Sequence, residues 1–326
     1  MKLEVLNGDS REILKSLPDN SIDSLVTDPP SGIAFLNLPW DWDKGGMWPW
    51  IRWLKKILDE CHRVMKPGSH GLVWALPRTA HWTAMALECS GFEIRDSIHH
   101  TFGQGFIQGN LNCEKYVDES LKGMGTLLKR AHEVWWLVRK PIEKGLTLSD
   151  NIRKWNAGYL NVDGCRVLYK PGDNLKGKKI KVRNNGQIFG GNSYQDSATK
   201  GDDDGIDANE IGRWPPNVLF SHAPECSFGP CVAWCPVRDF DEANGVRASS
   251  SRKAGQQRRN EKNILGGKFR SGASVKGSGA VSRYFPVFYY HAKPGRSEKT
   301  KGLEGDPLRP SQKLNPGGIN DRKSRS

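Results

Sequence analysis

One short stretch of the chain combines a carboxylate with an unusually stiff backbone. Residues 25–27 end a β-prone apolar run, and Asp28 stands where this strand must stop, because Pro29 and Pro30 follow it. Proline has no N–H to give to a sheet and fixes its own φ angle. The stretch therefore predicts a rigid loop at the carboxyl end of a strand, where open α/β sheets bind ligands. The Asp28 carboxylate and the Pro29 carbonyl are two fixed acceptors, suited to an amino group such as the exocyclic amine of a nucleobase.

The segments around this loop alternate between strand and helix patterns. Residues 71–76 form a continuous apolar run, as in a strand covered on both faces. Residues 48–65 place apolar side chains at helical spacing. Further strands are predicted at residues 2–6, 91–101, 131–138 and 284–291, and a second long helix at residues 79–88. This alternation predicts an α/β fold with a doubly wound sheet.

The motif Asp28-Pro29-Pro30-Ser31 resembles the catalytic Asp-Pro-Pro-aromatic motif of DNA amino-methyltransferases, which methylate adenine N6 or cytosine N4. More narrowly, residues 1–140 resemble the phage and prophage DNA methyltransferases, in which a small residue and Gly-Ile follow Asp-Pro-Pro. The resemblance implies a Rossmann-like class I methyltransferase sheet, S-adenosylmethionine as the methyl donor and double-stranded DNA as the substrate. The simpler alternative is a proline turn that ends an ordinary strand.

The resemblance also implies roles for single residues. Asp28 and the Pro29 carbonyl would accept both hydrogens of the target amine, and an Asp at this position favours adenine N6, because the cytosine-N4 members more often carry Ser. Asp9 is implied to contact S-adenosylmethionine together with Asp28, although it could serve only as the cap of the helix after it. Cytosine N4 methylation, a catalytically inactive DNA-binding fragment and an RNA methyltransferase are the alternatives.

In one position the motif departs from the family. The family places an aromatic ring after Asp-Pro-Pro, which stacks on the extruded base, and Ser31 cannot stack. A base–aromatic stack is worth about 1–3 kcal/mol, so another ring should replace it. Phe35, Trp40 and Trp42 are the nearest candidates in the sequence, with a weak preference for Phe35. Ordinary loop packing is the alternative for all three.

The positive charge is concentrated in the last quarter of the chain. The net charge is +13, and residues 245–326 contain 19 Lys and Arg against 5 Asp and Glu. Such a segment is typical of contact with a polyanion, and phosphate contacts would supply affinity without base choice. The predicted contacts are Arg252, Lys253, Arg258 and Arg259. A basic tail without a specific partner is the alternative.

Four potential metal ligands lie within 14 residues. His222, Cys226, Cys231 and Cys235 could close a tetrahedral zinc site. Their spacing is not one of the strong paired forms, because no Cys-x-x-Cys occurs there, and buried thiols without a metal are the alternative. If zinc binds, we expect it to stabilise a poorly packed region and not to catalyse.

The resemblance and the composition together divide the chain into three regions. Residues 1–139 are the predicted catalytic domain, with part of the doubly wound sheet. Residues 140–282 are the predicted target-recognition insert, partly irregular and partly disordered, because residues 184–212 are rich in Gly, Asn, Asp and Ser. Residues 283–326 are a returning strand and a basic tail, which the resemblance implies to be truncated before the family's Phe-x-Gly-x-Gly cofactor loop. Two alternatives follow: a truncated or split gene product, or a second chain that supplies the missing cofactor-binding half.

Composition also favours one cellular setting. No run of about 18 apolar residues occurs, as a membrane-spanning helix would require, and the N-terminus lacks a charged and then apolar leader. The seven cysteines are scattered and odd in number, which fits a reducing compartment better than a disulfide framework. The sequence therefore predicts a cytoplasmic protein of a bacterial or phage-infected cell, without a membrane partner.

Overall fold

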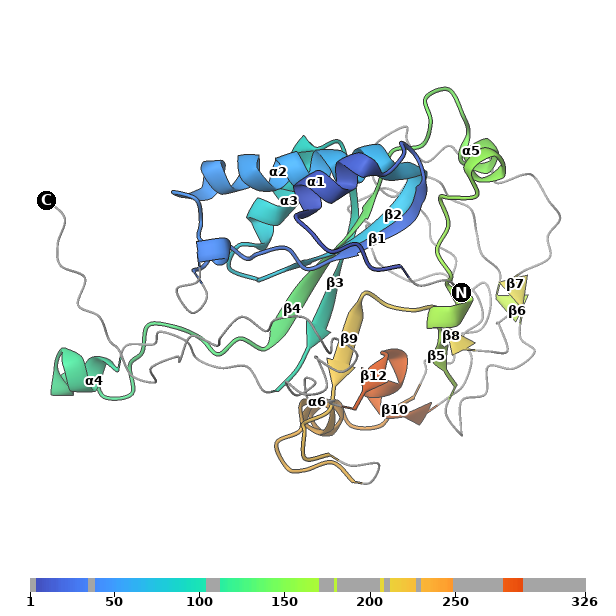
Figure 1. Ribbon diagram of the computed structural model, residues 1–326. Helices are drawn as coiled ribbons and strands as arrows, with labels where there is room; N and C mark the ends of the chain where they lie inside the picture. The colour runs from blue at the N-terminus through green and yellow to red at the C-terminus, as the bar shows by residue number, and fades with distance from the viewer. Residues whose placement is uncertain are drawn as a thin grey trace, which may run out of the picture. The chain divides into compact units, whose positions relative to one another are not determined.

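The computed structural model describes residues 4–34, 39–103, 112–169, 179–180, 206–207, 212–226, 230–248 and 278–289. Figure 1 shows the arrangement of the helices and strands. The α-helices are α1 (Ser10–Ile13), α2 (Met47–Val64), α3 (Ala80–Cys89), α4 (Cys113–Tyr116), α5 (Leu148–Trp155) and α6 (Pro236–Asn244). Short 3-10 helices occupy Leu14–Ser16, Pro39–Asp41, Glu119–Leu121, Asp163–Cys165 and Val281–Tyr284.

A six-stranded mixed sheet in the order β1-β2-β4-β3-β9-β12 organises the molecule. Its strands are β1 (Ile22–Thr27), β2 (Met65–Ala75), β3 (Glu93–Thr101), β4 (His132–Arg139), β9 (Val218–Ser221) and β12 (Val287–Phe288). Only β4 is antiparallel to its neighbours. The carboxyl ends of the other five strands consequently lie at one edge of the sheet, together with the amino end of β4. The predicted α/β class is confirmed.

Three two-stranded ladders lie outside this sheet, in the part of the chain that follows β4. They pair β5 (Val167–Leu168) with β8 (Gly212–Arg213), β6 (Lys179–Ile180) with β7 (Ile206–Asp207), and β10 (Arg247–Ala248) with β11 (Ser278–Gly279). All three are antiparallel. Residues 140–282 thus contribute both these ladders and β9 of the main sheet, and the boundaries of the three predicted regions stay a prediction.

Helices α2 and α3 cover one face of the sheet (Figure 1). Helix α2 forms because apolar side chains recur on one side, and its inward positions are buried against the sheet at Val73 and Val138. Burying one such large side chain contributes about 1.5–3 kcal/mol. The buried positions of α2 are Trp50, Ile51, Leu54, Leu58, Cys61 and Val64. The predicted helix over residues 48–65 is therefore confirmed.

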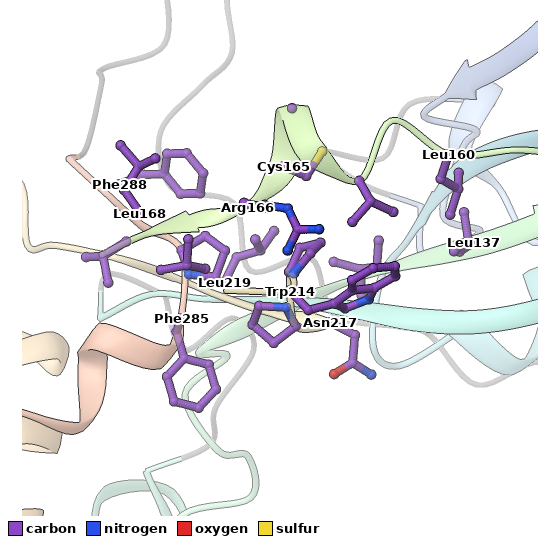
Figure 2. Close-up of a pocket in the computed structure, with 18 of the residues that line it drawn as sticks. Leu137, Leu160, Cys165, Arg166, Leu168, Trp214, Asn217, Leu219, Phe285 and Phe288 are labelled. Atoms are coloured by element: carbon purple, nitrogen blue, oxygen red, sulfur yellow. The ribbon is translucent and has the colours of Figure 1, made fainter. Parts of the chain in front are cut away.

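The other face of the sheet borders a cavity of about 1250 Å³. Leu72 and Leu137 alternate with the core residues Val73 and Val138, so they point away from α2 and line this cavity. Figure 2 shows the apolar side chains that enclose it from the segments around β5, β8 and β12. Asp28 is not among the lining residues. The cavity is therefore distinct from the loop that the sequence singles out.

Two predicted strands differ in the structure. Residues 4–6 of the strand predicted at 2–6 are irregular, and Val5 is exposed. A single strand is held by hydrogen bonds to a neighbour, and no strand lies beside these residues in the described part of the chain. The strand predicted at 284–291 is reduced to β12, because a 3-10 helix runs through Tyr284 and Pro286 has no N–H to donate.

The described helices include none that is both long and apolar enough to cross a membrane.

Candidate functional site

The Asp28 carboxylate stands at the carboxyl edge of the sheet. Strand β1 ends at Thr27, whose partner in parallel β2 is Val73, and Asp28 is the next residue. Its side chain is exposed. In the described residues β1 is an edge strand that pairs only with β2, and Val26 is 70% exposed. The geometry thus presents the carboxylate to the solvent and does not pack it into the core.

A second carboxylate, fully buried, holds the loop after Asp28 in place. Asp41 Oδ1 accepts hydrogen bonds from the backbone N–H of Ser31 (2.6 Å) and of Gly32 (2.9 Å). Asp41 Oδ2 accepts one from the N–H of Ile33 at 3.4 Å, and the Asp41 carbonyl accepts one from the N–H of Ala34 at 2.8 Å. A carboxylate that accepts several N–H groups is a strong and directional anchor. The predicted rigid loop therefore owes its shape to Asp41 as well as to its prolines.

Two further contacts fix the same loop. The Thr79 hydroxyl donates to the Ser31 carbonyl at 2.7 Å, although Thr79 stands at the N-cap of α3, where its hydroxyl would ordinarily cap the helix. Gly32 has a φ angle of +71°, and a Cβ built on it would lie 2.7 Å from the Trp50 indole nitrogen. Only glycine fits this position, because it combines a left-handed backbone with close contact to a buried ring.

Two of the predicted stacking residues are the direct neighbours of the loop anchor Asp41. Trp40 and Trp42 flank the buried Asp41, and they are 55% and 47% exposed. The Ser31 N–H donates to Asp41, which brings the backbone between these two residues to the motif loop. Their stacking role stays a prediction. The Ser31 hydroxyl points to Asp41 Oδ1 at 3.2 Å, as a loop contact and not as a base contact. Phe35 lies outside the described residues.

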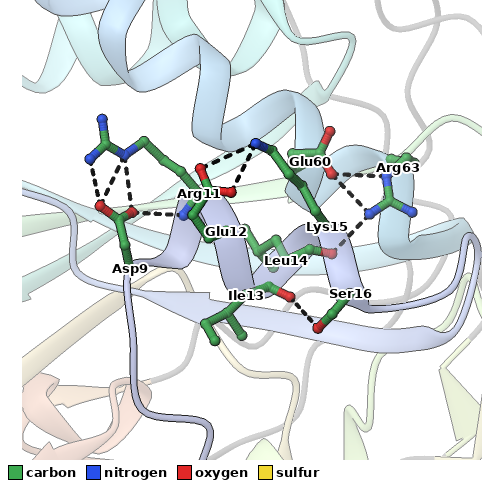
Figure 3. Close-up of polar contacts among 9 residues, drawn as sticks. All are labelled: Asp9, Arg11, Glu12, Ile13, Leu14, Lys15, Ser16, Glu60 and Arg63. Carbon is green, nitrogen blue, oxygen red and sulfur yellow. Dashed lines mark hydrogen bonds and ion pairs between the residues drawn. The ribbon is translucent and has the colours of Figure 1, made fainter.

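Asp9 is the N-cap of α1, and Figure 3 shows its contacts. Its Oδ1 accepts from the Arg11 backbone N–H at 2.9 Å, and its Oδ2 pairs with the Arg11 guanidinium at 2.5 Å. Hydrogen bonds from Arg11 lower the pKa of Asp9 to about 2. The carboxylate is therefore an anion at neutral pH, able to accept hydrogen bonds. The capping role is confirmed, and the cofactor contact stays a prediction.

The four predicted metal ligands converge in the structure. The ligand atoms of His222, Cys226, Cys231 and Cys235 all lie within 4.8 Å of one another. His222 Nδ1 is 3.3 Å from Cys231 Sγ and 3.4 Å from Cys235 Sγ. Desolvation opposes the ionisation of Cys235, but backbone hydrogen bonds from Ala223 and from Arg238 and Val237 of α6 outweigh it and lower the pKa of this thiol. By contrast, the predicted DNA contacts Arg252, Lys253, Arg258 and Arg259 lie outside the described residues.

Sequence reasoning missed two residues that position the motif. Asp41 carries no sequence signal of its function, because a carboxylate in a Trp-rich loop ordinarily faces solvent. Thr79 was expected only as a helix cap, and its contact to Ser31 spans 48 residues. The one hint in the sequence is that Asp41 lies between Trp40 and Trp42, nine residues after Gly32.

A family comparison matches most of the chain. The model of the N6/N4 methyltransferase family, described as DNA methylase, matches residues 22–260. These residues include the motif at Asp28, the anchor Asp41 and the four clustered ligands. Asp9 lies before the matched segment.

Individual relatives match shorter segments. The chain is 38% identical over 72 residues to the type II methyltransferase M.BglII of Bacillus subtilis, which covers 22% of this chain and 18% of that protein. It is 29% identical over 107 residues to the DNA adenine methyltransferase YhdJ of Escherichia coli K12, or 32% of this chain and 35% of YhdJ. The chain thus spans well under two thirds of the length of these relatives.

Among solved structures, the cytosine-N4-specific PvuII DNA methyltransferase aligns with 47% of this chain and 54% of its own, at 17% identity and a TM-score of 0.31.

Proposed function

Because the chain belongs to the N6/N4 family of DNA methylases, we propose that it transfers a methyl group from S-adenosylmethionine to adenine N6 in DNA. One observation carries the proposal. The exposed Asp28 carboxylate follows an edge strand, and a buried carboxylate, Asp41, holds the next residues through backbone hydrogen bonds. This arrangement places an exposed carboxylate directly before an anchored loop.

The chemistry required of the chain is mainly orientation. The lone pair of an exocyclic amine is conjugated with the base, which makes the amine a poor nucleophile. If the Asp28 carboxylate accepts one amine hydrogen and the Pro29 carbonyl accepts the other, the lone pair is directed towards the incoming methyl carbon. S-adenosylmethionine supplies this methyl group when bound. As the amine nitrogen forms the new C–N bond, the bond between the methyl carbon and the sulfonium sulfur would break and S-adenosylhomocysteine would leave. The nitrogen afterwards loses one proton, which the Asp28 carboxylate would accept.

The target base must leave the duplex to reach these acceptors. Extrusion costs a few kcal/mol of unstacking, which the protein has to recover. We propose that Trp40 or Trp42 stacks on the extruded base in place of the aromatic residue that Ser31 replaces. Both residues are exposed and adjoin Asp41, the residue that anchors the motif loop, which supports this role. The basic residues Arg252, Lys253, Arg258 and Arg259 remain the proposed contacts to the phosphate backbone.

Nucleoside analysis tests the proposed reaction and its target. We expect the chain, with labelled S-adenosylmethionine and DNA from a methylation-deficient host, to produce labelled N6-methyladenine that is identified by chromatography and mass spectrometry after digestion. Labelled N4-methylcytosine would show that the chain acts by the same mechanism on cytosine, the base named for the PvuII enzyme. Label in RNA alone would contradict DNA as the substrate. DNA binding without transfer of label would indicate an inactive binding fragment.

Replacing Asp9 tests its proposed contact to the cofactor. We expect Asp9→Ala to weaken the binding of S-adenosylmethionine about 10- to 100-fold, because the loss of one hydrogen bond to a charged acceptor costs about 1.5–3 kcal/mol. Titration calorimetry measures this change directly. Arg11→Ala is the matched control, since it breaks the same ion pair and leaves the Asp9 carboxylate in place. Equal affinities of wild type and Asp9→Ala for S-adenosylmethionine would show that Asp9 only caps α1.

We also propose that a second chain completes the sheet beside β1. In the described residues β1 has one open edge, Val26 is largely exposed, and the face with Leu72 and Leu137 lines an apolar cavity. An open edge of this kind is a template for pairing with another strand. The partner would be a polypeptide that carries a strand able to pair with β1.

A further inference from the structure

We propose that His222, Cys226, Cys231 and Cys235 bind one structural Zn²⁺ ion. In a tetrahedral site with Zn–S bonds of about 2.3 Å and Zn–N bonds of about 2.0–2.1 Å, adjacent ligand atoms lie about 3.5–3.8 Å apart. The distances from His222 Nδ1 to the sulfurs of Cys231 and Cys235 are 3.3 and 3.4 Å. All four ligand atoms lie within 4.8 Å of one another. The ligands thus stand close to tetrahedral spacing.

The fold holds the imidazole of His222 by contacts that do not involve the thiols. Its backbone N–H donates to the Phe288 carbonyl at 2.8 Å, and its ring stacks on Tyr289 with a centroid distance of 4.6 Å and an interplanar angle of 16°. The preceding residue, Ser221, contacts His100 Nε2 through its hydroxyl at 2.7 Å. These contacts fix the ring at the end of β9 and direct Nδ1 to the sulfurs.

Cys235 is placed by a different element. It is the N-cap residue of α6, so the start of this helix fixes its position. The cluster therefore joins the residue after a strand, the turn that contains Cys226 and the residue before a helix.

The set of ligands selects the metal and its role. Three thiolates and one imidazole suit Zn²⁺, whereas Mg²⁺ and Ca²⁺ prefer oxygen ligands. No carboxylate belongs to the cluster found among the described residues. Four protein ligands close the tetrahedron and leave no position for a reactive water, so the site is structural and not catalytic.

The ion would stabilise a small core. The buried residues of this core are Ala223, Cys226, Cys235 and Val237, so two of the four are themselves ligands. Helix α6 also carries Asp241, which accepts hydrogen bonds from the Ser282 N–H (2.7 Å) and hydroxyl (2.6 Å). Zinc would therefore link β9 to α6 and, through Asp241, to the turn before β12. It would stand at the same edge of the sheet as Asp28, on the far side from β1.

Metal analysis of the purified full-length chain tests the site. We expect one zinc per chain by atomic emission spectroscopy after purification without chelators. After exchange with Co²⁺, we expect the visible d–d bands of a tetrahedral ion and a thiolate-to-cobalt charge-transfer band. Absence of both stoichiometric zinc and the cobalt bands would overturn the proposal.

Two variants locate the site on these ligands. Cys231→Ser should weaken zinc binding by more than about 100-fold, because even residues that only orient a metal ligand cost about 10–100-fold when replaced. Cys89→Ser, at an exposed cysteine outside the cluster, should keep one zinc per chain. Equal zinc content in both variants would overturn the assignment. If Cys231→Ser fails to fold, the cobalt spectrum of the wild type decides alone.

A disulfide is the competing fate of cysteines this close together. No disulfide joins any of the seven cysteines in the structure. We therefore expect seven titratable thiols in the chain denatured with a chelator and without a reductant. A count of two fewer thiols, together with absence of zinc, would show that two cysteines form a disulfide and would overturn the metal site. Hydrogen exchange offers an independent readout, since zinc removal should speed exchange in α6 and β9 and leave α2 unchanged.

Discussion

Replacing Asp28 with alanine should reduce methyl transfer by at least about 10²–10³-fold, the typical loss when one preorganised group that stabilises a transition state is removed. The carboxylate is proposed to accept a hydrogen from the target amine and so to direct its lone pair. DNA affinity should stay close to that of wild type, because a single exposed side chain at the end of β1 adds little to a contact dominated by phosphates. Single-turnover transfer and fluorescence anisotropy on the same duplex measure the two effects.

Asp23→Ala is the matched control for this experiment. Asp23 lies on the same strand, β1, and pairs with Lys66 at 2.5 Å with an exposed carboxylate. Exposed ion pairs contribute about 0–1 kcal/mol, so transfer by this variant should stay near the wild-type rate. A parallel fall of transfer and DNA affinity in Asp28→Ala would show that Asp28 serves binding and not the chemical step.

Replacing Asp41 with asparagine should impair both folding and turnover. One carboxylate oxygen would become an NH₂ group that faces backbone N–H donors, such as the N–H of Ile33, in a fully buried place. An unpaired buried donor costs about 1–3 kcal/mol, which we expect as the loss in the free energy of unfolding. The displaced loop should lower kcat about 10²-fold, the order of loss that a 1 Å misplacement causes. Denaturant unfolding and steady-state kinetics measure the two effects.

The neighbouring Asp43 provides the control. Its exposed side chain accepts a hydrogen bond from the Gly45 N–H at 3.0 Å, so Asp43→Asn should change stability and turnover little. A structural role alone would lower the folded fraction without changing kcat per folded molecule. A positioning role requires that kcat falls at a temperature where Asp41→Asn is fully folded. An unchanged kcat under that condition would contradict it.

Much of the fold was predictable because it follows from local chemistry. The apolar spacing in residues 48–65 predicts α2, since only one face of that helix can be buried. The uninterrupted apolar run at residues 71–76 predicts a central strand, and all of it except Leu76 lies in β2. Pro29 and Pro30 predict the end of the strand before them, and β1 does end at Thr27, two residues before Pro29. Each of these features depends on residues close together in the chain.

The errors arose where a neighbour distant in sequence decides the outcome. Residues 2–6 have strand composition, but a strand also needs a partner, and none lies beside residues 4–6 in the described structure. In the order β2-β4-β3, strand β4 lies antiparallel between β2 and β3. The local sequence does not distinguish this pairing from other pairings of the same strands. Pairing is a tertiary property, because its hydrogen bonds join residues far apart in the chain.

The candidate sites divide in the same way. The sequence by itself determined the chemical groups: a carboxylate before two prolines, a Ser where a ring is usual, and three thiols with an imidazole within 14 residues. Only the tertiary structure brought Asp41 and Thr79 to the loop and gathered the four ligand atoms within 4.8 Å. The reason is physical: residue types set which bonds can form, whereas the packing of distant elements sets which of those groups come within bonding distance.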